Sequence, residues 1–213
     1  EALLAGHWAL APYSAEPKTP LAGSRLQQLG TAKTGAAAAR ATDWPTYRHD
    51  AQRTGTTTAE VGQIGNMAWE LPFSGKLSAP TVVGDSVYVS QVDSHTVHAV
   101  SLDEGEVLWS YTAGGAVDSP PTFHAGRLYF GSVDGYIYCL DAATGEPVWR
   151  FLAAPADRRM VSYDRLESVW PVHGSVLVHQ GAVWAAAGRS SYLDGGIRLW
   201  RLHPGTGQVL SQG

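Results

Sequence analysis

Two stretches of the sequence, residues 155–171 and 189–196, combine arginine, acidic, hydroxyl and aromatic side chains as ligand-binding loops do. The candidate binding residues in them are Arg165, Trp170, Arg189, Tyr192 and Asp194. A guanidinium group binds carboxylate or phosphate through paired hydrogen bonds, and aromatic rings offer flat stacking surfaces. We therefore consider the two arginines as anion or carboxylate anchors and Trp170 and Tyr192 as stacking platforms.

The same residues allow a simpler interpretation, in which the charges of the loops pair with one another. Arg165 or Arg189 would then meet a nearby carboxylate, and no ligand would be needed. The carboxylates within reach along the chain are Asp164, Glu167 and Asp194. Both interpretations stay open, and the sequence offers no catalytic residue.

The sequence contains few residues that could bind a metal ion or form a disulfide. The single cysteine, Cys139, excludes an internal disulfide and a four-cysteine zinc site. His95 and His98 are three apart on an expected strand, so their side chains point to opposite faces. His173 and His179 are expected at the two ends of one strand, too far apart to bind one ion. We predict no metal site and no cofactor.

The composition indicates which elements position the two loops. The 213 residues include 24 glycines and only 16% charged residues, which favours short strands joined by turns over a helical bundle. A net charge of −4 provides no basic field for nucleic acid or anionic lipid. No run of apolar residues is long enough for a transmembrane helix.

A repeat of 40 residues organises most of the chain, because Trp69, Trp109 and Trp149 follow one another at that interval. The sequence between them repeats in kind, and turns such as Thr144-Gly145 divide each copy into short β-branched and aromatic runs. Four antiparallel strands that recur at this interval are typical of a propeller blade. The chain is therefore predicted to be all-β.

We expect two full blades, most of a third, and one strand of an earlier blade at residues 66–70. The third copy has its first strand over residues 172–178, its second over 181–188 and its third over 197–202. Ser211 stands where the repeated tryptophan is due.

The first 42 residues are expected to form an arm or linker, because they mix Pro, Ser, Gly and a run of alanines without strand alternation. A short helix is an option around residues 24–29. The apolar residues 2–11 would be a short helix packed on the domain, or the stub of a targeting segment. The propeller segment is predicted to span residues 43–213.

Residues 139–149 resemble the tryptophan-docking motif of pyrroloquinoline-quinone (PQQ)-like β-propellers, A-x-D-x-x-T-G-x-x-x-W, with Cys139 as the one departure. The first copy matches more loosely, since Ser101 and Glu104 replace Asp and Thr. Residues 43–55 look like the motif found where such repeat domains begin. The resemblance implies a partial PQQ-like β-propeller of four-stranded antiparallel blades with an irregular N-terminal arm.

In this family the tryptophan of one blade lies flat against the next blade. The residues that the resemblance assigns to this docking are Trp69, Trp109, Trp149, Thr144 and Gly145. Within residues 43–55 the residues that could suggest a site are Trp44, Arg48, Asp50 and Arg53. We expect instead that Trp44 packs on the first blade, while Arg48 and Asp50 fasten the arm.

The resemblance also raises the question of an activity. Quinone-dependent dehydrogenases of this class hold PQQ and Ca²⁺ on the axis of eight blades with Glu, Asn and Asp oxygens, and many carry a disulfide between adjacent cysteines. This chain has one cysteine, and its one asparagine, Asn66, lies on an expected outer strand. We therefore predict a non-catalytic scaffold or protein-interaction module. The alternatives are a segment of a PQQ-dependent dehydrogenase or larger enzyme, and a sugar- or anion-binding module.

An array of about three blades exposes two sheet edges and apolar surface between blades. We expect a protein partner, further blades or the arm to cover them. The resemblance implies a periplasmic, exported or cell-surface protein.

Overall fold

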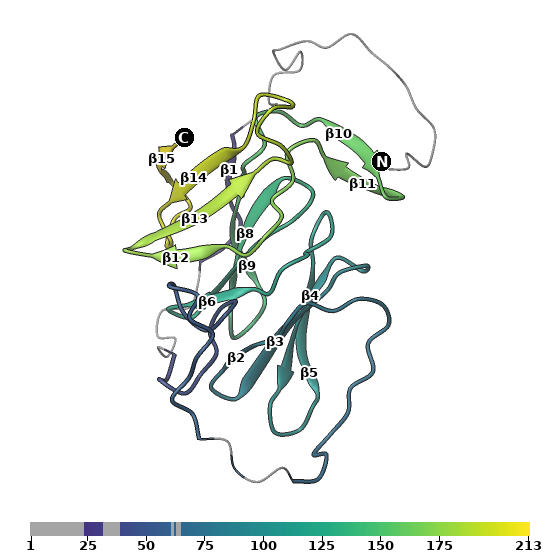
Figure 1. The fold of residues 1–213 in the computed structure, drawn as a ribbon, viewed down its shortest axis with the longest axis vertical. Helices are drawn as coiled ribbons and strands as arrows, with labels where there is room; N and C mark the ends of the chain where they lie inside the picture. Colours follow the sequence, from purple (N-terminus) through teal and green to yellow (C-terminus); the bar gives the residue numbers. More distant parts are fainter. Residues whose placement is uncertain (1–23, 32–38, 61, 63–64) are drawn as a thin grey trace.

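The computed structural model describes residues 24–31, 39–60, 62 and 65–213. Their strands form three antiparallel sheets and a separate hairpin, and Figure 1 shows the three sheets following one another along the long axis of the molecule. The described residues contain no helix, and hence none that could cross a membrane. The predicted all-β fold is confirmed.

The three sheets are propeller blades, each with four strands in chain order, and one sheet carries a fifth strand at its outer edge. Blade 1 consists of β2 (Thr81–Val83), β3 (Ser86–Gln91), β4 (Thr96–Ser101) and β5 (Val107–Thr112). Blade 2 consists of β6 (Thr122–His124), β7 (Arg127–Gly131), β8 (Tyr136–Asp141) and β9 (Pro147–Leu152). Blade 3 consists of β12 (Leu177–His179), β13 (Ala182–Ala187), β14 (Arg198–Leu202) and β15 (Val209–Gln212).

Blade 3 differs from the prediction in two respects. It has four strands, because β15 pairs with β14 although Ser211 stands in place of the tryptophan. Its first strand is limited to Leu177–His179, so the predicted strand over 172–178 is largely wrong. The reason is that β12 pairs only with the first half of β13, from Trp184 to Ala182.

β1 (Leu26–Gln28) takes the place of the short helix considered for residues 24–29. It pairs antiparallel with the outer edge of β9, with Leu26 opposite Phe151. The side chain of Arg25 strengthens this attachment, since Nη1 donates to the carbonyl oxygen of Ala154 at 2.6 Å. A helix at this place would leave the outer edge of β9 without these hydrogen bonds. The apolar residues 2–11 lie outside the described part of the chain.

The repeated tryptophans lie flat on the turn of the following blade. The ring of Trp109 covers Gly145, where an added Cβ would come within 2.5 Å of the ring. The Nε1 of Trp109 donates to the carbonyl oxygen of Ala142 at 3.1 Å. Trp149 and Trp69 repeat this arrangement, each with a glycine under the ring and an acceptor three residues before it. These pairs are Gly207 with Pro204 and Gly105 with Leu102.

Residues 66–70 are not a strand, contrary to the prediction, because no neighbouring strand is present among the described residues. The segment around these residues nevertheless lies against blade 1. Trp69 is docked on Gly105, and the ring of Phe73 stacks on His98 of β4 at a centroid distance of 4.5 Å. Blade 2 forms the centre of the core, where the largest fully buried side chains include Trp149, Tyr129, Tyr138, Phe130 and Phe151.

The position of a glycine under each tryptophan ring predicts how much a glycine-to-alanine substitution there destabilises the protein. Gly145→Ala is expected to destabilise the protein more than Gly174→Ala, as measured by urea unfolding. Both glycines have positive φ, 74° and 72°, so alanine carries the same backbone strain of roughly 1–2 kcal/mol at either position. Only at position 145 does the Cβ also displace a tryptophan ring, because nothing lies within 4 Å of the Cβ at Gly174. Equal effects would contradict the docking arrangement.

Candidate functional site

Residues 155–171 form an inserted hairpin between blades 2 and 3, built from β10 (Arg159–Ser162) and β11 (Arg165–Ser168). Figure 1 shows the hairpin extending away from the three blades. Tyr163 and Asp164 at its tip both have positive φ, 49° and 60°, which is the conformation of a two-residue turn with the twist of a hairpin. The hairpin is therefore a regular element and not an irregular loop.

Two ion pairs attach one face of the hairpin to two different blades. Arg165 pairs with Asp93, which follows β3 in blade 1. Glu167 pairs with Arg189, which follows β13 in blade 3. Arg165 and Glu167 are two residues apart on β11, so their side chains share a face. The hairpin thus connects the first blade to the third, and the Glu167 side chain is only 7% exposed at this contact.

Trp170 and Asp194 also meet, although not as parts of a stacking site. The Nε1 of Trp170 donates to the backbone oxygen of Asp194 at 2.8 Å, and the Asp194 carboxylate lies 3.3 Å from Arg158. Tyr192 is 92% exposed and has no ring contact with any described residue. Of the five candidates, the structure brings Trp170 and Asp194 together, directs Arg165 and Arg189 to carboxylates, and leaves Tyr192 in solvent. These contacts correspond to the charge-paired interpretation.

Sequence reasoning missed Asp93 as the partner of Arg165, but the repeat contains a signal for it. Asp93 is the counterpart of Asp134, which is buried in blade 2 and accepts a hydrogen bond from the hydroxyl of Tyr138 at 2.5 Å. Blade 1 has His98 in the position of Tyr138, and that imidazole bonds to Ser110 instead. Blade 1 thus has the aspartate but not the tyrosine that binds it in blade 2. The carboxylate of Asp93 is therefore able to pair with Arg165 of the hairpin.

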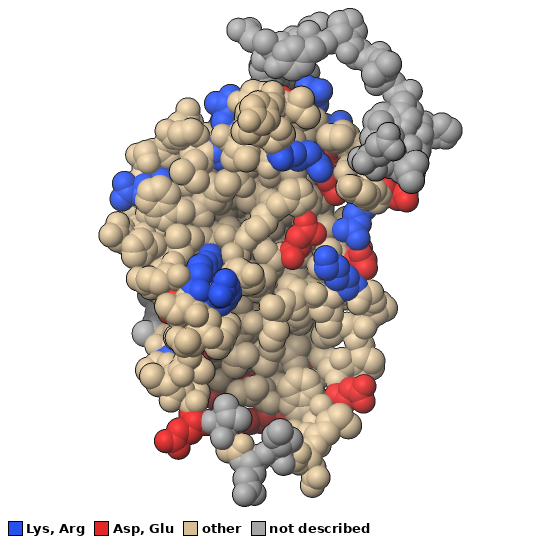
Figure 2. Space-filling model, in the orientation of Figure 1, with Lys and Arg blue, Asp and Glu red and all other residues tan. Residues whose placement is uncertain are grey.

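A second pair that the sequence did not indicate joins Asp118, between blades 1 and 2, to His173. The Nδ1 of His173 lies 2.8 Å from the Asp118 carboxylate. This hydrogen bond, more than the nearby charges of Arg165 and Lys76, holds the pKa of Asp118 below its ordinary value of 3.8. Figure 2 shows acidic and basic side chains next to one another on the side where the hairpin lies. The opposite charges are adjacent and leave no field of one sign.

The lowered pKa of Asp118 predicts a pH dependence of stability. A carboxyl whose pKa is lower in the folded state stabilises the protein above its unfolded pKa, and this contribution is lost as pH falls through the folded value. The difference in unfolding free energy between the wild type and Asp118→Asn should therefore shrink as the pH falls below about 4. Urea titrations at a series of pH values measure it. A difference that does not shrink in acid would contradict the role of the hydrogen bond between Asp118 and His173.

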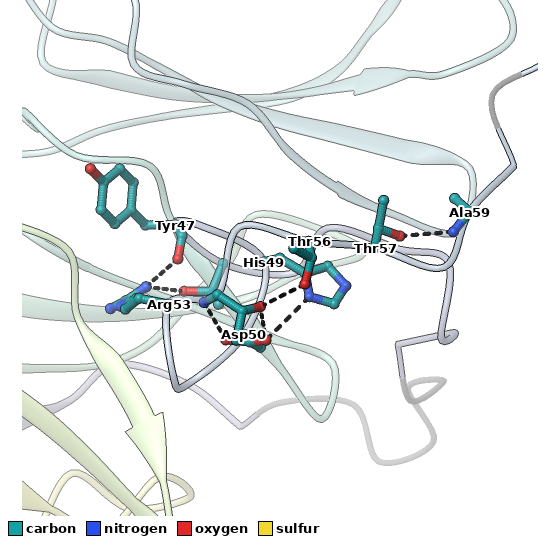
Figure 3. Close-up of polar contacts among 9 residues, drawn as sticks. Tyr47, His49, Asp50, Arg53, Thr56, Thr57 and Ala59 are labelled. Carbon is teal, nitrogen blue, oxygen red and sulfur yellow. Dashed lines mark hydrogen bonds and ion pairs between the residues drawn. The ribbon is translucent and has the colours of Figure 1, made fainter.

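Residues 43–55 form a compact turn structure that is held together from within (Figure 3). Asp50 accepts a hydrogen bond from the amide of Thr54 at 3.0 Å, and the hydrogen bond from the Thr54 hydroxyl is the main cause that lowers the pKa of Asp50 to about 2. Arg53 donates to the backbone oxygen of Tyr47 at 2.6 Å. Arg48 acts through its backbone oxygen, which accepts from the amide of Gly55 at 3.0 Å. The side chains of Asp50 and Arg53 therefore make hydrogen bonds within the segment.

The segment is attached to the first strands of blades 1 and 2. Trp44 forms a two-way backbone bridge with Val82, at 2.7 and 3.0 Å, and the hydroxyls of Thr46 and Thr122 lie 2.9 Å apart. A pocket of about 310 Å³ remains between the segment and blades 2 and 3. Its lining includes Pro45, His49, Asp50, Phe123, His124 and Leu177.

The described residues do not fit the quinone and Ca²⁺ site that the sequence resemblance raised. Three acidic side chains near the hairpin, Asp93, Asp118 and Glu167, are each paired with a cationic or imidazole side chain. No group of three His, Cys, Asp or Glu that could hold a metal ion occurs in the described part of the chain. Cys139 is buried, and burial raises the pKa of its thiol.

Three four-stranded blades that dock through tryptophan on a glycine turn define a β-propeller repeat protein of the PQQ-like class. Residues 50–213 match the PQQ_2 family, described as Outer membrane protein assembly factor BamB. The chain belongs to this family. The resemblance expected from the sequence is confirmed.

The chain is also similar to parts of quinoprotein dehydrogenases. It is 29% identical over 189 residues to the quinohemoprotein alcohol dehydrogenase of Comamonas testosteroni, and the match covers 77% of this chain and 26% of that protein. The solved structure of that enzyme superposes with a TM-score of 0.65 at 25% identity, covering 83% of this chain and 28% of the other. A europium-containing methanol dehydrogenase superposes with a TM-score of 0.64 at 21% identity, covering 82% and 32%. The chain spans about a quarter to a third of these relatives.

Proposed function

We propose that this chain is a non-catalytic propeller scaffold that binds a protein partner through the hairpin β10–β11 and the neighbouring loop of residues 189–196. The observation that carries the proposal is the pairing of the candidate charges. Arg165 and Arg189 are each committed to a carboxylate, so they hold the hairpin in place rather than a ligand. What the loops offer to the outside is their other, apolar surface.

That apolar surface lies on the face of the hairpin that points away from the ion pairs. Val161 and Leu166 are directly opposite each other in the register and are 71% and 56% exposed. Tyr163 at the tip is exposed as well, and so are Tyr192 and Leu193 in the loop of residues 189–196. An isolated two-stranded hairpin is marginally stable in water, and exposed apolar patches on proteins mark interaction sites. A partner that covers this face would stabilise the hairpin and bury its exposed apolar side chains.

The same proposal includes a place in the cell. The description of the family names an assembly factor for outer membrane proteins, which supports a periplasmic, exported or cell-surface location. Fractionation of the source cells with compartment markers tests this, and recovery with cytoplasmic markers would contradict it.

A second candidate is a segment of a quinoprotein dehydrogenase, favoured by the identity of 27–29% to several such enzymes. In that case other parts of the molecule would hold the quinone, since the residues described here do not fit one. The two candidates differ in a measurable property, the binding of the cofactor.

Titration of the intact protein with PQQ and Ca²⁺ distinguishes the two candidates. We expect no saturable change in quinone absorbance and no alcohol-dependent reduction of an electron-accepting dye. The alcohol dehydrogenase of Comamonas testosteroni, treated in the same way, is the positive control. A saturable complex with dye reduction would overturn the scaffold proposal in favour of the dehydrogenase segment.

The partner surface can be tested with a photo-crosslinking residue placed at Tyr163 in the cell. We expect a discrete adduct at this position and none at Leu102, an exposed residue in the β4–β5 turn of blade 1. Leu166→Ser should weaken the adduct, because it removes apolar area from the same face. Equal cross-linking at positions 163 and 102 would contradict a specific surface.

A further inference from the structure

The outer edge of β9 holds residues 24–30 of the chain as an added strand, and the backbone hydrogen bonds run along nearly the whole of β9. At one end the amide of Leu152 donates to the backbone oxygen of Arg25 at 2.8 Å. At the other end the amide of Leu29 donates to the backbone oxygen of Val148 at 2.9 Å. Between these ends β1 pairs with β9 residue by residue. Addition of an extended segment to a sheet edge is a recurring mode of peptide recognition.

The side chain of Arg25 fits a cage of backbone oxygens beside this edge. Its Nη1 donates to the oxygens of Leu152 at 3.1 Å and Ala154 at 2.6 Å, and its Nη2 donates to that of Pro155 at 3.1 Å. The guanidinium carbon also lies 5.5 Å from the centroid of the Trp200 ring. A planar group with several fixed donors suits such a converging set of acceptors, and no other side chain offers the same fork. The groove therefore has a specific place for arginine.

The next two side chains of the segment are recognised as well. Leu26 packs against the hydrophobic core, and its Cδ1 lies so close to Gly207 that an added Cβ there would come within 2.7 Å of it. The Oε1 of Gln27 accepts a hydrogen bond from the Nε of Arg150 at 2.7 Å. An apolar residue and a side-chain acceptor thus follow the arginine.

Two further positions depend on the identity of the residue. The Nε2 of Gln28 donates to the backbone oxygen of Thr206, between β14 and β15 of blade 3, at 2.6 Å. At Gly30 the segment passes so close to β9 that an added Cβ would come within 2.9 Å of the backbone oxygen of Pro147. The groove therefore selects a sequence, and not only an extended backbone.

Most contacts of the segment lie at the surface of the molecule. β1 is three residues long, and residues 28–31 are exposed. Burial, and after it the nearby charge of Arg198, lowers the pKa of Arg25, so the groove holds this cation close to a like charge. A segment bound in this way resembles a ligand more than a part of the core.

We infer that the groove along the outer edge of β9 is a sequence-specific peptide site. Its ligand is an extended segment that carries arginine, an apolar residue and two glutamines in succession, with glycine two residues further on. Residues 24–30 occupy the site as a tethered ligand, and a free peptide of the same pattern exchanges with them. This site is separate from the hairpin surface and does not depend on the proposed scaffold role.

Fluorescence anisotropy of a labelled peptide with the sequence of residues 24–31 tests the inference on the intact protein. In the wild type the tethered segment competes at an effective concentration on the order of millimolar, so the peptide should bind weakly. Arg25→Glu in the protein weakens this competitor, and the peptide should then bind at least about tenfold more tightly. Leu26→Ala is a second protein variant that weakens the competitor without a change of charge.

Variants of the peptide test its sequence pattern on the Arg25→Glu protein. A peptide with Arg25→Ala should bind at least about tenfold more weakly, because it loses the hydrogen bonds to three backbone oxygens. A peptide with Gly30→Ala should also bind more weakly, because the added Cβ meets the Pro147 oxygen. The matched control is Thr31→Ala, at an exposed position, which should bind like the original peptide.

The position of the bound peptide is tested by cross-linking. A peptide with a photoreactive leucine at position 26 should join the protein at Gly207 or at Trp149, the residues that Leu26 approaches. A cross-link confined to other parts of the protein would overturn the inference.

The binding measurements can overturn it in three further ways. Equal affinity of the peptide for the wild type and for Arg25→Glu would mean that it does not compete with the tethered segment. Equal affinity of the original and the Arg25→Ala peptide would mean that the groove does not read the sequence. If neither protein variant binds the peptide, or if both fail to unfold cooperatively, the segment is a permanent part of the fold and not a ligand.

Discussion

Trp149→Ala is expected to lower the free energy of unfolding by about 3–5 kcal/mol, the range for truncation of a large buried aromatic side chain. The ring is fully buried between blade 2 and the Gly207 turn of blade 3, and its Nε1 donates to Pro204 at 3.1 Å. The variant loses apolar burial and leaves the Pro204 oxygen without its donor. In a chain of this length the melting temperature should fall by about 6–20 °C.

Trp69→Ala is the matched control, because Trp69 makes the same contact with Gly105 but is only half-buried and belongs to no strand. Its effect should be clearly smaller. Calorimetry of both variants measures the difference. An unchanged melting temperature for Trp149→Ala would show that the tryptophan does not fasten blade 2 to blade 3.

Arg189→Ala is expected to destabilise the protein by about 3–5 kcal/mol, because it leaves the buried Glu167 carboxylate without its partner. The Glu167 side chain is 7% exposed, and the residue is part of β11. Its carboxylate therefore cannot reach water unless the hairpin moves. Adding Glu167→Gln should restore most of the loss, since a neutral amide is much easier to bury. Urea unfolding of the two single variants and the double variant forms the cycle that measures this coupling.

The control for this prediction is the exposed pair Arg159 and Asp157, 3.5 Å apart. Arg159→Ala should cost less than about 1 kcal/mol, as is usual for ion pairs at the surface. A similar loss for Arg159→Ala and Arg189→Ala would mean that burial does not govern the Glu167 contact.

Much of the fold could be predicted from the sequence, because the signals are local and repeated. The 40-residue spacing of Trp69, Trp109 and Trp149 and the glycine turns between them defined the blades and their four strands. Short strands with tight turns pair with their sequence neighbours, so a periodic sequence implies a periodic chain of sheets.

The errors arose where distant segments meet. Residues 24–29 showed no strand pattern, yet Gln28 pairs with Trp149 across more than a hundred residues, because the outer edge of β9 offers free hydrogen-bonding groups. Residues 66–70 carry a strand-like sequence but lack a partner strand among the described residues. In both cases the environment, and not the local sequence, decided the secondary structure.

For the candidate site the division is similar. The sequence by itself determined that this chain is a tryptophan-docked propeller array, and that Arg165 and Arg189 lie in insertions longer than a blade needs. Only the tertiary structure decided what the arginines do, with Arg165 directed to Asp93 and Arg189 to Glu167. The reason is that a repeat encodes contacts between neighbours in sequence, whereas the partner of a charge depends on which distant carboxylate the fold brings within a few ångströms.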